Sequence, residues 1–325
     1  MSRLVVVTGG AGFIGAHVVR ALVAGGNQVR VVDDLSTGHR AYLDGVPHDL
    51  VVARADDAPA VRAALAGAHA IIHLAALTSI PESIADPLGS FDENVATTVA
   101  LLAMARDLGV ARFVLASSNA ALGSHPPPLH EDLVASPTSP YGASKLAGEA
   151  YVQAFAATYG MTACALRFSN VYGWWSLHKT SVVAAWIRAA EAGEPLVING
   201  DGSQTRDYVH ANDLAEATLA VIDAPADAVA GQVFQVGAGV ETSLLELVEA
   251  LRGAVGRPLA VRHGPPRPGD VARNVSLCAK ADERLGWRAR TPLEEGLAGT
   301  VAWYRAALAD PALASIMPAA SSGSE

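Results

Sequence analysis

Thr8-Gly9-Gly10-Ala11-Gly12-Phe13-Ile14-Gly15 is the stretch that decides the fold, because it joins the apolar run Leu4–Thr8 to a helical pattern. Its glycines fit the spacing GxGxxG from Gly10 and the related spacing GxxGxxG from Gly9. Glycine lets the backbone turn tightly and lets a pyrophosphate approach a helix N-terminus, where free N–H groups and the helix dipole favour negative charge. The stretch therefore predicts a strand, turn and helix that bind a dinucleotide.

A carboxylate follows at the end of the next apolar run. Asp33 lies 18 residues after Gly15. At this place a carboxylate can accept hydrogen bonds from the adenosine ribose hydroxyls and repel a 2′-phosphate. The pattern favours NAD over NADP.

Apolar runs alternate with helical patterns through the first half of the chain. The expected strands are Leu4–Thr8, Gln28–Asp33, Leu50–Arg54, Ala70–Leu74, Arg112–Ala116 and Thr162–Phe168. Near-continuous apolar strands separated by helices indicate a parallel sheet that is covered on both faces. We therefore predict an α/β fold with a doubly wound parallel Rossmann sheet.

The pattern changes after Gly173, where shorter elements follow. Helices are expected over Val182–Ala192 and Leu244–Val255 and a strand over Pro195–Ile198, whereas the Pro- and Ser-rich stretch Ser124–Pro140 is expected to form a loop. We predict an NAD-binding Rossmann domain over residues 1–173, to which later segments return, and a smaller C-terminal α/β substrate lobe over 174–309. The small, polar and aperiodic residues 310–325 are expected to be disordered.

Composition and charge disfavour several classes of protein. The chain has 51% hydrophobic residues, but its apolar runs are far shorter than the ~20 residues that span a bilayer, so no membrane partner is expected. The first strand starts at Leu4 and leaves no room for a leader, which favours a cytoplasmic protein. A net charge of −9 disfavours nucleic acid as a partner. Cys164 and Cys278 lack metal-ligand spacing, so neither a metal site nor a disulfide is expected.

A second group of residues carries chemistry. Tyr141 and Lys145 follow Pro140, a residue suited to a first helical turn, and their spacing of four places them on one helix face. A cation beside a phenol lowers the pKa of the phenol, so Tyr141 can act as a base toward a substrate hydroxyl. Ser118 follows a strand at the carboxyl edge of the sheet, where open α/β folds bind ligands. These residues predict oxidation of a hydroxyl by hydride transfer.

Eight motifs make the chain resemble the extended short-chain dehydrogenases/reductases, and among them the nucleotide-sugar epimerases of the UDP-glucose (UDP-galactose) 4-epimerase type. They cover residues 8–270 in order: TGGAGFIG from Thr8, DDLSTG from Asp33, HLAA from His73, SSNAALG from Ser117, PYGASK from Pro140, LRFSNVYG from Leu166, GDGSQTRDYVH from Gly200 and RPGD from Arg267.

The resemblance implies an NAD-dependent site. The cofactor-binding residues that it implies are Gly9, Gly12, Phe13, Ile14, Asp33, Asp34, Ser36, Thr37, Gly38, Asp56, Leu74, Ala75, Ala76, Asn94, Tyr141 and Lys145. It implies that Tyr141 is the base, that Lys145 binds the nicotinamide ribose and tunes Tyr141, and that Ser118 hydrogen-bonds the sugar 4-hydroxyl. The expected substrate-binding residues are Ser118, Asn170, Lys179, Asn199, Arg206, Arg267, Asp270 and Asn274.

The implied reaction is inversion of a nucleotide-diphosphate sugar at C4 through a transient 4-keto intermediate. Related dehydratases need an acid after the Ser/Thr, and Asn119 and Ala120 stand there instead, which disfavours elimination. An NAD(P)H-dependent 4-ketoreductase of a dTDP-deoxysugar and a non-catalytic dinucleotide-binding regulator are the alternatives outside epimerisation.

The sugar is left open by the sequence. Asn199 stands where an aromatic residue commonly stacks on uracil, and Asn274 has a middling size at the position that gates N-acetylated sugars. The run Trp174–Lys179 could pack within the smaller lobe, or it could stack on a sugar and bind a hexuronate carboxylate through Lys179. UDP-glucuronate and UDP-N-acetylhexosamine 4-epimerases are therefore alternatives. By resemblance, a homodimer is expected through helices over Leu88–Leu108 and Tyr141–Tyr159.

Overall fold

The main sheet joins strands from both halves of the chain. The computed structural model describes residues 2–266 and 271–317. Within these ranges the sheet has seven parallel strands in the order β10-β6-β5-β4-β1-β2-β3. They are β1 (Leu4–Thr8), β2 (Gln28–Asp33), β3 (Asp49–Val52), β4 (Ala70–His73), β5 (Arg112–Ser118), β6 (Thr162–Phe168) and β10 (Val233–Val236). The order reverses between β1 and β4, so the predicted doubly wound α/β fold is confirmed.

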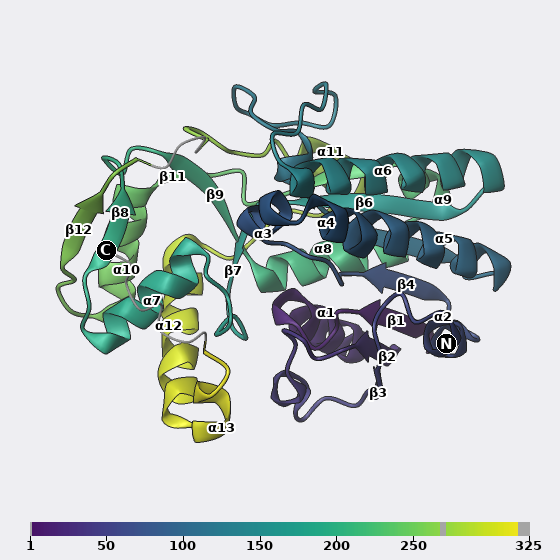
Figure 1. The fold of residues 1–325 in the computed structure, drawn as a ribbon, viewed down its shortest axis with the longest axis horizontal. Coiled ribbons are helices and arrows are strands. Elements are labelled where there is room, and N and C mark those ends of the chain that lie inside the picture. The colour runs from purple at the N-terminus through teal and green to yellow at the C-terminus, as the bar shows by residue number, and fades with distance from the viewer. Residues whose placement is uncertain (1, 267–270, 318–325) are drawn as a thin grey trace.

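Helices cover both faces of this sheet (Figure 1). On one face lie α2 (Ala58–Leu65), α5 (Thr97–Asp107) and α6 (Pro140–Tyr159), and on the other lie α1 (Phe13–Ala24) and α8 (Ala211–Asp223). Val5 and Val7 of β1 belong to one core cluster and Val6 to the other. The strands read as continuous apolar runs because both of their faces are buried.

The connection from β4 to β5 carries several short helices. They are α3 (Ile80–Ala85), α4 (Pro87–Phe91), a π-helical turn (Asp92–Ala96) and α5. Ser79 and Asp86 cap α3 and α4 by accepting backbone N–H bonds. The helix expected over Leu88–Leu108 therefore contains a π turn, a feature common at functional sites.

The second lobe contains two small sheets, at the left of Figure 1. One is β11 (Glu241–Ser243), β9 (Thr205–His210) and β7 (Asn170–Tyr172), and the other is β12 (Val261–Gly264) and β8 (Leu196–Asn199). The remaining helices are α7 (Val182–Ala192), α9 (Ala226–Val229), α10 (Leu244–Val255), α11 (Ala279–Leu285), α12 (Leu293–Ala309) and α13 (Pro311–Ala314), with 3-10 turns at Arg40–Leu43 and Asn119–Ala121. Strand β10 and helix α8 return to the main sheet from beyond residue 173.

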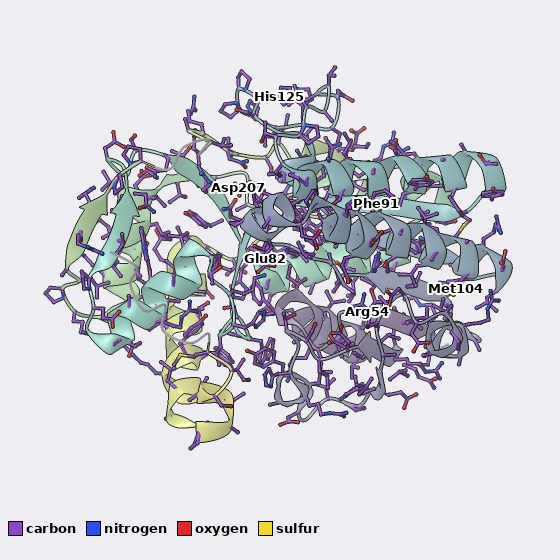
Figure 2. All side chains as sticks on the ribbon, viewed as in Figure 1. Arg54, Glu82, Phe91, Met104, His125 and Asp207 are labelled. Carbon is purple, nitrogen blue, oxygen red and sulfur yellow. The ribbon has the colours of Figure 1, made fainter. Side chains whose placement is uncertain are left out.

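Two segments lie outside the regular layers. The chain between Gly123 and Ser139 forms loops beyond the end of the sheet, with His125 near their outer end (Figure 2). Residues Pro311–Ala314, at the start of the segment expected to be disordered, instead form the short helix α13, which Asp310 caps by accepting a hydrogen bond from Ala312 N (2.9 Å). Residues 318–325 lie outside the described part of the chain. Among the described helices, none is long and apolar enough to cross a membrane.

We expect Gly15→Ala to destabilise the fold by about 1–3 kcal/mol, because an added methyl group overpacks the junction of β1 and α1. A Cβ at Gly15 would lie 2.2 Å from Gly9 O. Gly253→Ala is the matched control, since nothing lies within 4 Å of a Cβ there and alanine stabilises a helix interior by up to about 1 kcal/mol. Urea unfolding measures both, and equal midpoints in the two variants would contradict the close approach.

Candidate active site

The turn between β1 and α1 leaves no room for a side chain at Gly9. Gly9 has a φ of +69°, and a Cβ on it would lie 2.7 Å from Ala75 N. Helix α1 starts at Phe13 with Gly12 as its N-cap, and no side chain caps it. Its first N–H groups therefore remain available to an anion, which fits the pyrophosphate of a dinucleotide.

Asp33 lies beside this turn at the end of β2 and is 7% exposed. Ala11 N donates to its Oδ2 (2.9 Å) and Leu35 N donates to its Oδ1 (2.9 Å). Burial raises the pKa of Asp33, and these two hydrogen bonds oppose the rise. Each carboxylate oxygen keeps a second acceptor position, which suits the two hydroxyls of a ribose.

The loop after Asp33 continues along the same edge. Asp34 accepts hydrogen bonds from the N–H (2.9 Å) and the hydroxyl (2.6 Å) of Ser36, so these two residues shape the turn. Thr37 and Gly38 follow, and a Cβ on Gly38 would lie 2.7 Å from Asp33 Oδ1. Glycine at position 38 thus allows the loop to approach the Asp33 carboxylate.

Asp56 is held by an arginine that the sequence did not single out. Arg54 donates to both oxygens of Asp56 (2.9 and 3.0 Å) and also to Glu93 Oε1 (2.6 Å). Arg54 is labelled in Figure 2. These hydrogen bonds lower the pKa of Asp56. An arginine two residues before an acid is too common a pattern to be recognised as a site from sequence.

Asn94 supports the loop that follows β4. Its Oδ1 accepts from Leu77 N (2.8 Å), and its Nδ2 donates to Leu77 O (2.9 Å) and Ser144 Oγ (2.9 Å). The loop Leu74–Ala76 comes directly before Leu77 and lies against Gly9. Asn94 therefore connects this loop to α6 through protein contacts.

Ser118, Tyr141 and Lys145 come together where β5 ends against the start of α6. Ser139 caps α6 by accepting from Gly142 N (3.1 Å), and Pro140 occupies its first turn, as predicted. The Ser118 side chain lies near the Tyr141 phenol and favours its ionised form. Lys145 Nζ donates to Ala116 O (2.9 Å) and lies 5.8 Å from the centroid of the Tyr141 ring.

The pKa of Tyr141 in the trio Ser118, Tyr141 and Lys145 differs from the expectation. Burial raises the pKa of Tyr141, and the Ser118 side chain opposes the rise. Burial also lowers the pKa of Lys145 to about 8. The expected lowering of the Tyr141 pKa by Lys145 is therefore not seen, because both groups are buried and the ammonium is bonded to the Ala116 carbonyl.

Three of the expected substrate residues, Asn170, Asn199 and Arg206, lie on the two small sheets. Asn170 starts β7, opposite Tyr208 of β9. Arg206 Nη1 donates to Thr205 O (2.7 Å) and Val271 O (2.6 Å), and Asn199 ends β8. Arg267 and Asp270 lie outside the described residues.

Asn274 belongs to a buried polar network beside Ser118. Its Oδ1 accepts from Asn119 Nδ2 (3.2 Å), which also donates to Ser169 Oγ (3.2 Å) and Ser276 Oγ (3.0 Å). Ser169 Oγ in turn donates to Asp207 on β9, which Figure 2 labels (3.1 Å). Asn274 is therefore connected to Asn119, the residue that directly follows Ser118.

The tryptophans after Gly173 pack against α1. The His17 ring lies 5.9 Å from Trp174 and 4.5 Å from Trp175 between ring centroids, and Arg20 lies 4.5 Å over the Trp175 ring. These contacts favour the packing interpretation over sugar stacking. Lys179 reaches the loop after β4, with its Nζ 3.4 Å from Thr78 Oγ1, and burial lowers its pKa.

The chain matches the model of the family described as "NAD dependent epimerase/dehydratase family" over residues 5–237. It is 39% identical to a UDP-glucose 4-epimerase of Mycolicibacterium smegmatis, over 92% of this chain and 97% of that protein. The chain belongs to the NAD dependent epimerase/dehydratase family.

Solved structures agree with this assignment to the epimerase/dehydratase family. The UDP-glucose 4-epimerase of Thermotoga maritima with UDP-glucose has a TM-score of 0.88 and 33% identity, over 94% of this chain and 99% of that one. The UDP-N-acetylglucosamine 4-epimerase of Methanobrevibacter ruminantium, in complex with UDP-N-acetylmuramic acid, has a TM-score of 0.88 and 30% identity, with the same coverage.

Besides Arg54, three further residues of this epimerase-family site were missed from the sequence. Ser83 Oγ accepts from Tyr141 N (3.1 Å) and connects α3 to the start of α6. Glu149 and Arg167 form a buried ion pair below the trio (2.7 Å). Glu149 could have been found, since it lies four residues after Lys145 on the same helix face. Ser83 and Arg167 carry no such local signal. Among the described residues, no group of acids, histidines and cysteines could hold a metal ion.

We expect Asp33→Asn to weaken NAD binding by about 10- to 100-fold, because hydrogen bonds to a charged group contribute about 1.5–3 kcal/mol. The NH₂ group of the asparagine would also face Ala11 N or Leu35 N, which are both donors. Asp49→Asn is the control, an exposed acid at the start of neighbouring β3. Calorimetric titration of NAD-free protein measures both affinities. Equal affinity of Asp33→Asn and the parent chain would contradict the assignment.

Proposed function

We propose that the chain is an NAD-dependent 4-epimerase of a nucleotide-diphosphate sugar of the UDP-glucose/UDP-galactose type, acting through a transient 4-keto sugar. The observation that carries the proposal is that Tyr141 and Lys145 at the start of α6 meet Ser118 at the end of β5, with Lys145 Nζ 5.8 Å from the centroid of the Tyr141 ring. The relatives named UDP-glucose 4-epimerase support the same reaction, since one of them is 39% identical over nearly the whole chain.

In this proposal the cofactor lies across the carboxyl ends of β1, β2 and β4. The backbone of Gly9 and Gly12 lets the pyrophosphate approach, the N–H groups of Phe13 and Ile14 at the start of α1 bind it, and Asp33 binds the adenosine ribose. Lys145 binds the nicotinamide ribose. When bound, NAD supplies the chemistry of taking a hydride from the sugar C4 and returning it to the opposite face.

Tyr141 and Ser118 move the proton of the sugar 4-hydroxyl. Tyr141 Oη takes this proton during oxidation and returns it during reduction, while Ser118 Oγ hydrogen-bonds both the sugar oxygen and Tyr141. Because burial raises the pKa of Tyr141, the ionised phenol needs a nearby positive charge. The Lys145 ammonium, 5.8 Å from the ring centroid, is the protein's source of that charge in the trio.

The position after Ser118 supports epimerisation over elimination. Asn119 is 5% exposed, and its NH₂ donates to three oxygen atoms. Ala120 offers no acid either. Neither residue can protonate a leaving hydroxyl, so the 4-keto sugar is reduced again rather than dehydrated.

A hexuronate is the second candidate sugar, and Lys179 favours it. The ammonium lies beside Thr78, and Ser83 in the helix just after Thr78 contacts the Tyr141 backbone. Glu82 is the nearby acid that raises the pKa of Lys179 against burial. A carboxylate on the sugar would give this half-buried cation a stronger partner than the Thr78 hydroxyl.

In the proposed homodimer, helices α4, α5 and α6 form the interface between the two subunits. Leu88 is 76% exposed and Phe91 53% exposed on α4, and Tyr151 is 43% exposed on α6, while Ile84 of the preceding helix is 62% exposed. Figure 2 labels Phe91 on this face. Helices α3 and α4 both contact α6, so these exposed apolar side chains are carried by neighbouring helices. A group of exposed apolar side chains on neighbouring helices is typical of a protein interface.

We expect the protein to interconvert UDP-glucose and UDP-galactose with no net formation of NADH. The test is a panel of UDP- and dTDP-linked glucose, galactose, N-acetylglucosamine and glucuronate, with NMR detection of inversion at C4. Consumption of added NAD(P)H with a 4-keto sugar would instead identify a ketoreductase. No conversion of any sugar would contradict the proposed function.

Two variants of α6, tested with the same panel of sugars, show whether Tyr141 is the base. Tyr141→Phe should lower turnover by about 10²- to 10⁴-fold, the range for loss of a general base. Tyr159→Phe removes the same hydroxyl from an exposed position at the end of α6 and should keep the parent rate. Retained turnover in Tyr141→Phe would exclude this residue as the base.

We expect the double variant Leu88→Glu/Phe91→Glu to be monomeric, because four charges placed across a two-fold interface repel one another and remain solvated in the monomer. Light scattering after size exclusion gives the mass. Val134→Glu is the control, since Val134 is 83% exposed on the distant 123–139 loops and its change should leave a dimer intact. A parent chain that is itself monomeric would refute the interface.

A further inference from the structure

Helix α6 carries a third ionisable side chain in line with the catalytic trio. Tyr141, Lys145 and Glu149 follow one another at intervals of four residues, so they lie along one helix face. Glu149 is 2% exposed. Its carboxyl group is surrounded by donors: Ser117 Oγ, Arg167 Nε (2.8 Å) and Arg167 Nη2 (2.7 Å). A carboxyl group that only accepts hydrogen bonds is an ionised carboxylate.

The Glu149 carboxylate binds both strands that lie under α6. Ser117 belongs to β5 and Arg167 to β6, and the two residues are partners across the sheet. Lys145 Nζ donates to the carbonyl of Ala116, the residue directly before Ser117. Two consecutive turns of α6 are therefore bonded to two consecutive residues of β5, Lys145 to Ala116 and Glu149 to Ser117. Ser118 is the next residue of the strand. A shift of α6 relative to β5 would separate Tyr141 from Ser118.

The charge of Glu149 acts on Lys145. Burial lowers the pKa of Lys145, and the negative charge of Glu149 opposes this effect. The other titratable group that faces Lys145 is His73 of β4, which burial keeps neutral with a pKa of about 3. It accordingly gives Lys145 no counter-charge. Tyr141, also buried, is the remaining neighbour and is a neutral phenol in this state.

Further charged groups face Glu149 from α11 and from the 123–139 loops. Lys280, Glu131 and Asp132 line a cavity of about 230 Å³ together with Glu149 and Arg167. Glu131 and Asp132 lie near Lys280 and raise its pKa against burial. The direct partner of Glu149 is Arg167, at hydrogen-bond distance, and the cavity places the other charges farther away.

We infer that Glu149 is a positioning residue of the proposed reaction, which holds Lys145 as an ammonium by its negative charge and holds α6 on β5 and β6 by its hydrogen bonds. Its effect on turnover rests on the proposed function, whereas its effect on Lys145 does not. No bond to substrate or cofactor is assigned to Glu149.

The titration of Lys145 can be measured directly by NMR, because the only lysines in the sequence are Lys145, Lys179 and Lys280. Protein labelled with ¹³C-lysine gives three Cε signals, and loss of one signal in Lys145→Met assigns it. Glu149→Gln alone leaves the buried Arg167 charge unpaired and can unfold the protein. The test variant is therefore Glu149→Gln/Arg167→Gln, which removes both charges together.

In this double variant we expect the Lys145 signal to titrate at lower pH than in the parent chain, while the Lys179 signal keeps its midpoint. Turnover should fall by about fourfold more at pH ~8 than at pH ~6.5, the difference in ammonium fraction when a titration with a midpoint of about 8 moves down by one unit. The sign follows from the charge: an ammonium that has lost its anion gives up its proton more readily.

Ser117→Ala is the control that separates charge from structure. It removes one hydrogen bond to Glu149 and keeps the carboxylate, so the Lys145 midpoint should stay at the parent value. An unmoved Lys145 midpoint in the double variant, or an equal shift in Ser117→Ala, would overturn the inference. If the proposed function were wrong, no nucleotide sugar would turn over, but the shift of the Lys145 signal would still be observed.

Discussion

The backbone of Gly9 lies so close to Gly15 and to Ala75 that a side chain fits at neither glycine. A Cβ on Gly15 would stand 2.2 Å from Gly9 O, and a Cβ on Gly9 would stand 2.7 Å from Ala75 N. This contact fixes α1 against β1 and fixes the loop after β4 against both. The free N–H groups of α1 consequently point to the place where the strand order reverses, and the Asp33 carboxylate is held beside them by Ala11 N.

The two halves of α6 are attached to the sheet in different ways. Its C-terminal half packs Val152 and Phe155 into the apolar core that α5 shares. Its N-terminal half instead buries Lys145 and Glu149, which bind the ends of β5 and β6 through hydrogen bonds. A buried ion pair adds little net stability compared with apolar side chains, but its geometry is more restrictive. The polar half lies where the position of Tyr141 relative to Ser118 matters for chemistry.

Local pattern was sufficient to predict most of the fold. Strands β1, β2 and β6 and helices α7 and α10 have the predicted bounds, because Gly, Asp and Pro punctuate apolar runs whose period is clear. The π turn Asp92–Ala96 was missed, since it changes the hydrogen-bond register without changing the apolar pattern. The glycine turn, Asp33 and the Tyr141/Lys145 pair were predicted because each has a fixed spacing. Arg167 was not, because its partner Glu149 lies on another element, and the pKa of Tyr141 depends on burial that spacing does not report.

The polar network at Asn119 explains why the reaction class depends on more than one residue. Asp207 is buried and accepts hydrogen bonds from Ser169 Oγ, Ser276 N and Ala238 N. These donors are therefore already bonded to one carboxylate. Asn119 adds an NH₂ group that donates to Ser169 and Ser276. A carboxylate at position 119 would remove that donor and place a second negative charge beside Asp207. Burying a charge without a partner is strongly unfavourable, so the surrounding serines and Asn274 would have to change as well. The polar neighbours thus favour a neutral amide at position 119. A 4-keto sugar beside Ser118 consequently has no acidic side chain at this position.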